Sequence, residues 1–385
     1  MIHTPQSDGD ARPNAKTTAE MERLMMAVYG DWAEKKSSSA AAVAPSAAFP
    51  KPLPRGEAGE GRNKQRRYLW TDAFGLLNFV TLAHRAAEND DSTKREGYVS
   101  AGRRLIASVH STLGQPVDPN LYPMAKDKDG ATIGLRIGKV VNARKSDAGM
   151  EKDGMYWHYF DKWLFALHRF GQFTNDTKYT TQARQLAAKA HPYFVVPGKG
   201  VRWKINVDAS PIPDLEPPGP SSDAVSALLT YSLMALPDDD DRMAKDVRGP
   251  ARDYLHYAAS RYHRLDPLSF GLQAWEAQWM PPQVRERILA QLKACSSESL
   301  DVRSGMGLPF RLYGGLMGAI LLRNEEGFKE SAKSAARVAR ELGLEYEHNV
   351  PTGSSDHSAI NKVMLAAALD PWAWERRAFE RDLSV

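Results

Sequence analysis

Carboxylates, histidines and aromatic residues recur where the hydrophobic helical segments of this sequence begin. In chain order these residues are Trp70, Asp72, Asp153, Tyr156, Trp157, His158, Ser222, Asp223, Gln273, Trp275, Glu276, Arg311, Tyr313, Asp356 and His357. Carboxyl groups transfer protons and bind hydroxyl groups, and aromatic faces stack on pyranose rings. Asp and Ser are also the favoured N-caps of ordinary helices, so each residue alone can be a cap. Their joint occurrence is what indicates a sugar-binding or acid–base site.

The stretch DGMYWHYFDKWLFALHRFG (residues 153–171) has the strongest chemical character. On a helical wheel, Tyr156 lies on an aromatic face, whereas Trp157, His158 and Asp161 lie on a second, polar face. If this helix lines a central lumen, its second face looks inward. His158 is then a candidate acid, base or hydrogen-bond donor to a ligand, assisted by Tyr156.

Two loops add candidate binding residues. GLRIGK (134–139) places Arg136 and Lys139 between glycines, which suits an anionic or hydroxylated ligand, although a tight turn with solvated basic residues also explains it. The long loop 203–220 contains Trp203, Lys204 and Asp208 near its start. Loops of this length in a compact domain are often functional.

Several classes of protein are disfavoured. The sequence has no metal-ligand spacing, P-loop, dinucleotide-binding fingerprint or serine-hydrolase elbow, so we expect no metal and no cofactor. A net charge of +4 with interspersed acidic and basic residues predicts a small-molecule substrate rather than nucleic acid. Because Cys295 is the single cysteine, and neither a signal sequence nor a membrane-spanning apolar run is apparent, we expect a cytoplasmic protein.

Helical periodicity organises the chain into two parts. Residues 17–35 predict an amphipathic helix, and the Ser-, Ala- and Pro-rich stretch 37–67 predicts a linker or strap, so the expected division is 1–67 and 68–385. The second part contains six pairs of helical segments, each with a more buried helix followed by an amphipathic one. The predicted pairs are 71–89 with 92–114, 153–171 with 176–191, 221–236 with 244–263, 268–280 with 281–296, 309–323 with 325–343, and 354–369 with 370–383.

This alternation predicts an all-α (α/α)6 toroid. Helices that are apolar on most sides need protein around them, whereas amphipathic helices need it on one side. An inner ring of six helices within an outer ring of six satisfies both. A helical-repeat solenoid is the rival fold, but its repeats should recur at a fixed period and the intervals here are irregular.

The blocks RYLWTDAFGLLNF, GLRIGK, DGMYWHYFDKWLFALHRF and WKINVDAS occur in this order between residues 66 and 235. Together they resemble proteins of the six-hairpin glycosidase-like type. The resemblance implies the (α/α)6 toroid and a funnel built from the ends of the inner helices. The same fold hosts hydrolases, epimerases, lyases and isomerases, so it does not define the reaction.

The leading functional hypothesis is a carbohydrate-active enzyme that hydrolyses a small glycoside or oligosaccharide. Asp72 and Asp223 are its predicted carboxylate pair, assisted by His158 and Tyr156. The predicted substrate-binding residues are Trp70, Arg136, Lys139, Trp157, Asp161, Trp203, Lys204, Asp208, Glu276, Arg311, Tyr313, Asp356 and His357.

Two alternatives remain open at the sequence level. One is a lyase, isomerase or cyclase that acts on a small hydrophobic, terpenoid-like metabolite and uses Asp72 and His158 as an acid–base pair. The other is a non-catalytic toroid that serves as a binding or scaffold module.

Overall fold

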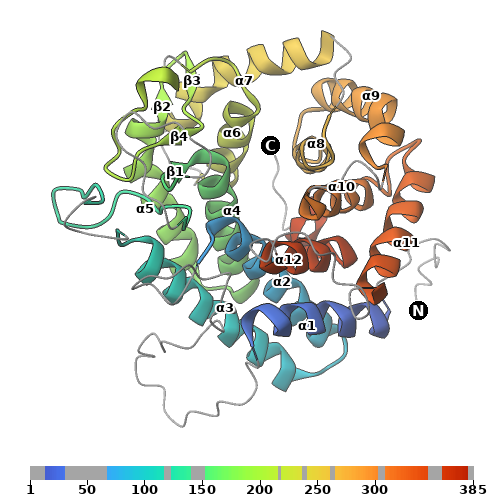
Figure 1. Cartoon of the computed structure of the whole chain (residues 1–385). Coiled ribbons are helices and arrows are strands. Elements are labelled where there is room, and N and C mark those ends of the chain that lie inside the picture. Colours follow the sequence, from blue (N-terminus) through green and yellow to red (C-terminus); the bar gives the residue numbers. More distant parts are fainter. Residues whose placement is uncertain are drawn as a thin grey trace, which may run out of the picture.

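A computed structural model describes most of the chain, with gaps (Figure 1). The described residues are 14–30, 67–116, 123–139, 152–215, 218–235, 241–260, 265–301, 308–345 and 358–379. Nearly all of the predicted linker lies outside these ranges, as do Asp356 and His357.

Six hydrophobic helices form a closed inner ring (Figure 1). They are α2 (Leu69–Glu88), α4 (Trp157–Thr174), α6 (Ser222–Met234), α8 (Pro267–Ala277), α10 (Pro309–Leu321) and α12 (Ser358–Leu369). Each contacts the next in chain order, and α12 contacts α2, so the ring closes. All six begin within a few residues of the predicted positions. Glycines allow the closest approach, between α8 and α10, where a Cβ on Gly271 would meet the carbonyl oxygen of Gly314.

Amphipathic helices cover the outside of this ring. They are α3 (Ser92–Leu113), α5 (Thr177–Phe194), α7 (Arg242–Ser260), α9 (Pro282–Ser299) and α11 (Lys329–Glu345). In α9, the buried residues Ile288, Leu292 and Cys295 follow helical spacing on one face. Inner and outer helices alternate along the chain, so the predicted (α/α)6 toroid is confirmed.

The sixth outer position differs from the prediction. The sequence predicted an outer helix over 370–383, but the described part of this range forms two 3-10 turns, η4 (Trp372–Trp374) and η5 (Arg376–Phe379). The N-terminal helix α1 (Ala15–Tyr29) packs on α12 and α2 instead. Its buried stripe of Met21, Leu24, Met25 and Val28 joins the common hydrophobic core.

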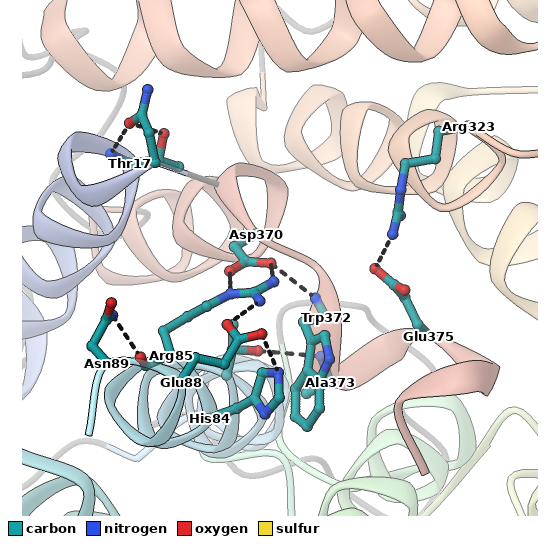
Figure 2. A network of polar contacts seen from close by, with 12 residues as sticks. Thr17, His84, Arg85, Glu88, Asn89, Arg323, Asp370, Trp372, Ala373 and Glu375 are labelled. Carbon is teal, nitrogen blue, oxygen red and sulfur yellow. Dashed lines mark hydrogen bonds and ion pairs between the residues drawn. The ribbon is translucent and has the colours of Figure 1, made fainter. Parts of the chain in front are cut away.

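The C-terminal segment 370–379 is attached to the inner helices by polar contacts (Figure 2). Arg85 of α2 donates to Asp370 at 2.7 Å, and the backbone N–H of Ala373 donates to Thr81 Oγ1 at 3.2 Å. Glu375 forms an ion pair of 2.9 Å with Arg323, shown at the right of Figure 2. These contacts attach the segment to α2 and to the residues just after α10.

Trp374 lies between helices from different parts of the ring. Its ring centroid is 4.4 Å from Phe74 of α2, 5.6 Å from Phe165 of α4 and 5.8 Å from Trp275 of α8. The side chain is 1% exposed. Trp374 therefore fills the interior that the inner ring encloses, and an extended outer helix would not bring it there.

Short strands anchor the loops next to α4. Strand β1 (Met155–Tyr156) pairs antiparallel with β4 (Lys204–Ile205), and β2 (Val195–Val196) pairs with β3 (Gly200–Val201). The backbone N–H of Trp157 also donates to the carbonyl oxygen of Trp203 at 2.9 Å. These bonds hold the loop after residue 203 against the N-terminal end of α4. Within the described ranges, every helix is too short or too polar to cross a membrane.

Candidate active site

An aromatic cluster lies at the N-terminal ends of α2 and α4. The ring of His158 is 5.9 Å from that of Trp70 and 4.6 Å from that of Tyr159. Tyr159 also shares a hydrogen bond of 2.6 Å with the hydroxyl of Tyr68. Trp70 is buried, whereas His158 and Tyr159 keep partial exposure. The structure therefore brings Trp70 and His158 together, as predicted for a site at this end of the ring.

A buried charged cluster follows one turn further along α4. Lys162 Nζ donates to Asp161 Oδ2 at 2.5 Å and to Ser226 Oγ of α6 at 2.9 Å. Ser226 in turn donates a short hydrogen bond to Asp161. The ammonium group also lies 4.4 Å from the ring centroid of Trp275 in α8, a cation–π contact. This cluster thus joins α4, α6 and α8.

Asp223 and Glu276 are the carboxyl groups on which the Lys162 charge acts. Burial raises the pKa of Asp223 to about 7, Lys162 opposes the rise, and the negative charge of Asp161 adds to it. Burial likewise raises the pKa of Glu276 to about 8, against the effect of Lys162 and with contributions from Asp161 and Asp223. Glu276 therefore keeps its proton near neutral pH and can act as an acid, whereas Asp223 divides between its protonated and ionised forms.

Asp223 keeps part of its surface exposed, although its pKa responds strongly to desolvation. Glu276 is 5% exposed and lies deeper.

His158 is held in its neutral form. Burial, together with the positive charges of Lys162 and Arg311, lowers its pKa to about 3. Arg311 stands in the first turn of α10, where it forms a 3.0 Å ion pair with Asp266 at the start of α8. A neutral imidazole has one N–H donor and one acceptor nitrogen, so His158 can hydrogen-bond a ligand, while the ionised form of Asp223 is the stronger base.

Asp72, the predicted partner of Asp223, has different surroundings. Asp72 accepts a hydrogen bond of 3.2 Å from Tyr29 of α1 and lies 3.4 Å from Arg67 Nε. Burial raises its pKa to about 6, and Arg67 opposes this rise. Asp72 therefore faces the outer helix α1, because the side of α2 that carries it is the side that α1 covers. The negative charge of Asp223 contributes to the raised pKa of Glu276, which we predicted as a binding residue.

Several other predicted residues have structural contacts. Arg136 is 3% exposed and binds Asp153 at 3.0 Å and the carbonyl oxygen of Gln115 at 2.7 Å. Asp208 accepts from the backbone N–H and the hydroxyl of Ser210, which closes a turn. These contacts favour packing and turn roles for Arg136 and Asp208, and we leave both out of the proposed site.

The strand pair β1–β4 places another group of predicted residues beside the aromatic cluster. Tyr156 packs its ring edge-on to Trp203, with centroids 5.3 Å apart, and Lys204 Nζ lies 5.3 Å from the Tyr156 centroid. Tyr156 and Lys204 are both 1% exposed. They therefore support the start of α4 from behind.

Trp157, Tyr313 and Lys139 complete the predicted residues that the structure describes. Trp157 packs between Phe194 of α5 and Tyr231 of α6. Tyr313 is buried in α10, and Lys139 is partly exposed beside Asp153, to which its backbone N–H donates. Of these three, only Lys139 keeps part of its surface accessible.

Sequence reasoning missed Lys162, Ser226 and Tyr159. Lys162 carried a usable signal, because a lysine in a helix that is otherwise hydrophobic must find a partner or a water-filled space. Ser226 and Tyr159 carried none, since their roles depend on which helix lies opposite. Among the described residues, no group of three or more His, Cys, Asp and Glu side chains is arranged to hold a metal ion.

Comparison with known proteins identifies the fold. No protein-family model and no curated protein matches the sequence. Among solved structures, the chain is similar to a glycoside hydrolase family 76 mannosidase from Bacteroides thetaiotaomicron VPI-5482, with a TM-score of 0.58 and 10% identity over 92% of this chain and 98% of that one.

Two further structures have similar folds. A family 76 glycoside hydrolase from a bovine B. thetaiotaomicron strain gives a TM-score of 0.55 at 10% identity, over 93% of this chain and 77% of that one. A sugar epimerase from a ruminal bacterium gives 0.52 at 10% identity, over 91% and 98%. The chain thus has the (α/α)6 toroid fold of these enzymes.

Proposed function

We propose that this protein is a carbohydrate-active enzyme that hydrolyses a small glycoside, with Glu276 and Asp223 as its carboxyl pair. The observation that carries the proposal is the pair itself, two desolvated carboxyl groups with raised pKa values beside one shared cation. Glu276, whose pKa is the higher, is assigned as general acid to the leaving-group oxygen. Asp223 is more readily ionised and is assigned as nucleophile or base.

The surroundings of the pair suit a sugar. Tyr159 and His158 are partly exposed beside Trp70 and offer ring surface for stacking on a pyranose. Two of the structurally similar proteins are glycoside hydrolases and one is a sugar epimerase, which supports a carbohydrate substrate through fold analogy.

Hydrolysis can be tested with a panel of aryl glycosides that differ in sugar and in leaving group. If Glu276 is the acid, Glu276→Gln should lower kcat/KM by about 10²–10⁴-fold for poor leaving groups. Good leaving groups depart without protonation, so kcat/KM should fall much less for substrates that carry them. Asp223→Asn should fail on both kinds of substrate.

Asp127→Asn is the matched control, because Asp127 pairs with Lys189 in an exposed loop away from the inner helices. It should leave turnover unchanged. Normal hydrolysis by both Glu276→Gln and Asp223→Asn would refute the assignment.

A second candidate reaction follows from neutral His158. An uncharged imidazole can donate a hydrogen bond to a substrate oxygen while the ionised form of Asp223 removes a proton from the neighbouring carbon, as an epimerase, isomerase or lyase requires. His158→Gln should then abolish isomerisation or elimination but reduce hydrolysis far less. Proton NMR in deuterated water, with free sugars and terpenoid alcohols as substrates, would detect solvent deuterium entering the product.

A further inference from the structure

Lys162 is the cation of the candidate site, and it is almost completely covered by protein. Its side chain is 2% exposed and the partner Asp161 is 0% exposed. An isolated ammonium group would lose much of its hydration energy in such a place, so it is retained only with compensating contacts. Asp161, Ser226 and the face of Trp275 provide these contacts.

The contacts of Lys162 fix the position of the ammonium group. Asp161 and Ser226 hold it from α4 and α6, and the Trp275 ring limits its movement toward α8. Trp275 is itself packed edge-on against Trp374, at 5.8 Å and 87°. The C-terminal segment thus supports the indole on which the cation rests.

The titratable and charged groups that interact with this cation, or with the carboxyl groups and histidine near it, lie on several elements. Asp161 and His158 belong to α4, Asp223 and Tyr231 to α6, Tyr254 to α7, Glu276 to α8 and Arg311 to α10. Asp161 already neutralises Lys162 in a direct ion pair. Asp223 stands one helical turn before Ser226 on the same face of α6, and Glu276 follows Trp275 in α8, so each carboxyl group belongs to a helix turn that contacts Lys162. Lys162 lowers the pKa of both groups, and Asp161 acts in the opposite direction.

We propose that Lys162 is a positioning residue whose fixed ammonium group stabilises the carboxylate forms of Asp223 and Glu276 in this buried part of the ring. Without this cation, an anion on either carboxyl group would face Asp161 and a desolvated environment. With it, Glu276 can give its proton to a leaving-group oxygen, and the carboxylate that remains is stabilised by a charge already in place. The inference deepens the proposed function, because it concerns the same carboxyl pair.

The test does not require a substrate. The carboxyl carbons of ¹³C-labelled Asp and Glu are followed by NMR from pH 4 to 10, with Asp223→Asn and Glu276→Gln used to assign the two signals. In Lys162→Met, both titration midpoints should move upward by about one pH unit or more, since a nearby opposite charge commonly lowers a carboxyl pKa by 1–3 units. Lys162→Arg keeps the charge and should restore most of the shift.

Two further variants keep the test decisive. Lys204→Met is the matched control, because Lys204 is also a buried lysine on an aromatic face but lies over Tyr156. It should leave both midpoints in place. If Lys162→Met does not fold because Asp161 loses its partner, the double variant Lys162→Met/Asp161→Asn removes both charges. The midpoints should still rise, because the lysine is the stronger of the two influences.

The outcomes separate the inference from the proposed function. Unchanged midpoints in a folded Lys162 variant would overturn the positioning role, even if glycosides are hydrolysed. Raised midpoints in a protein that hydrolyses no glycoside would support the role and refute only the reaction. Where activity is found, the alkaline limb of kcat/KM should move to higher pH in Lys162→Met and return in Lys162→Arg.

Discussion

Glu276 is deeply buried, and its carboxyl group has to ionise in the proposed reaction. Its pKa is raised to about 8 from an ordinary 4.5 by burial, so the folded protein binds this proton more tightly than the unfolded chain does. The contribution of protonated Glu276 to the free energy of unfolding is therefore fully present below pH 4.5, and it is lost as the pH rises through 8. A residue that reduces stability at working pH is characteristic of a functional site.

Glu276→Gln should consequently stabilise the protein at alkaline pH. We expect similar free energies of unfolding for variant and wild type at pH 4.5. The variant should be more stable by at least about 1.4 kcal/mol at pH 9, the equivalent of one pKa unit. Urea unfolding at both pH values measures the difference. Glu330→Gln, at an exposed position paired with Lys333, is the control and should show no such gap. Equal stability of wild type and Glu276→Gln at pH 9 would contradict the burial argument.

Sequence reasoning at this scale found the residue types but not their partners. Asp72, Asp223 and Glu276 all stand on inner helices, and helical periodicity assigns each to a face of its helix. It cannot say which helix covers that face. Asp72 accepts a hydrogen bond from Tyr29 of α1, whereas the positive charge of Lys162 acts on Asp223 and Glu276. This difference arises only from tertiary packing.

At the scale of elements, the segment after α12 is the least expected feature. Asp370 and Pro371 are good signals for a helix start, and the residues that follow have helical periodicity. The chain nevertheless forms 3-10 turns, because this conformation buries Trp374 among Phe74, Phe165 and Trp275. Burial of a large aromatic side chain outweighs local helix signals, which are worth about 1 kcal/mol each.

Trp374→Ala tests the importance of this segment. Removal of a buried tryptophan typically costs about 3–5 kcal/mol of unfolding free energy. Because Trp374 supports Trp275, the variant should also shift the midpoints of Asp223 and Glu276. Trp372→Ala, from the same turn, is the comparison. Trp372 is partly exposed and stacks on His84 at 3.6 Å, so we expect a smaller loss and unchanged midpoints. Equal losses in the two variants would show that Trp374 has no special place in the core.

At the scale of the whole molecule, the ring joins the two ends of the described chain. Helix α1 packs on α12, so residues 15–29 contact residues 358–369. The sequence predicted the alternation of buried and amphipathic helices correctly, because it depends on periodicity alone. It could not predict that the first helix takes the place of the last outer one, since several amphipathic stripes fit a given apolar surface equally well.

Because α1 packs on the inner helices α12 and α2, we expect it to unfold together with the toroid. The sequence had suggested a division at residue 67, with α1 in a separate N-terminal part. A separate unit would melt in its own transition, whereas a helix in the common core shares one cooperative transition with it. Leu24 is fully buried in the core that α1 shares with α2 and α12, and Met26 on the same helix is 38% exposed.

Leu24→Ala should therefore lower the global free energy of unfolding by about 2–5 kcal/mol, and Met26→Ala should change it by less than about 0.5 kcal/mol. Urea unfolding followed by far-ultraviolet circular dichroism and by tryptophan fluorescence distinguishes the two cases. Only Trp32 of the nine tryptophans precedes residue 70, so tryptophan fluorescence reports chiefly on the toroid. Coincident shifts of both signals in Leu24→Ala would establish α1 as the sixth outer helix. An early dichroism transition with an unshifted fluorescence midpoint would instead make α1 an independent unit.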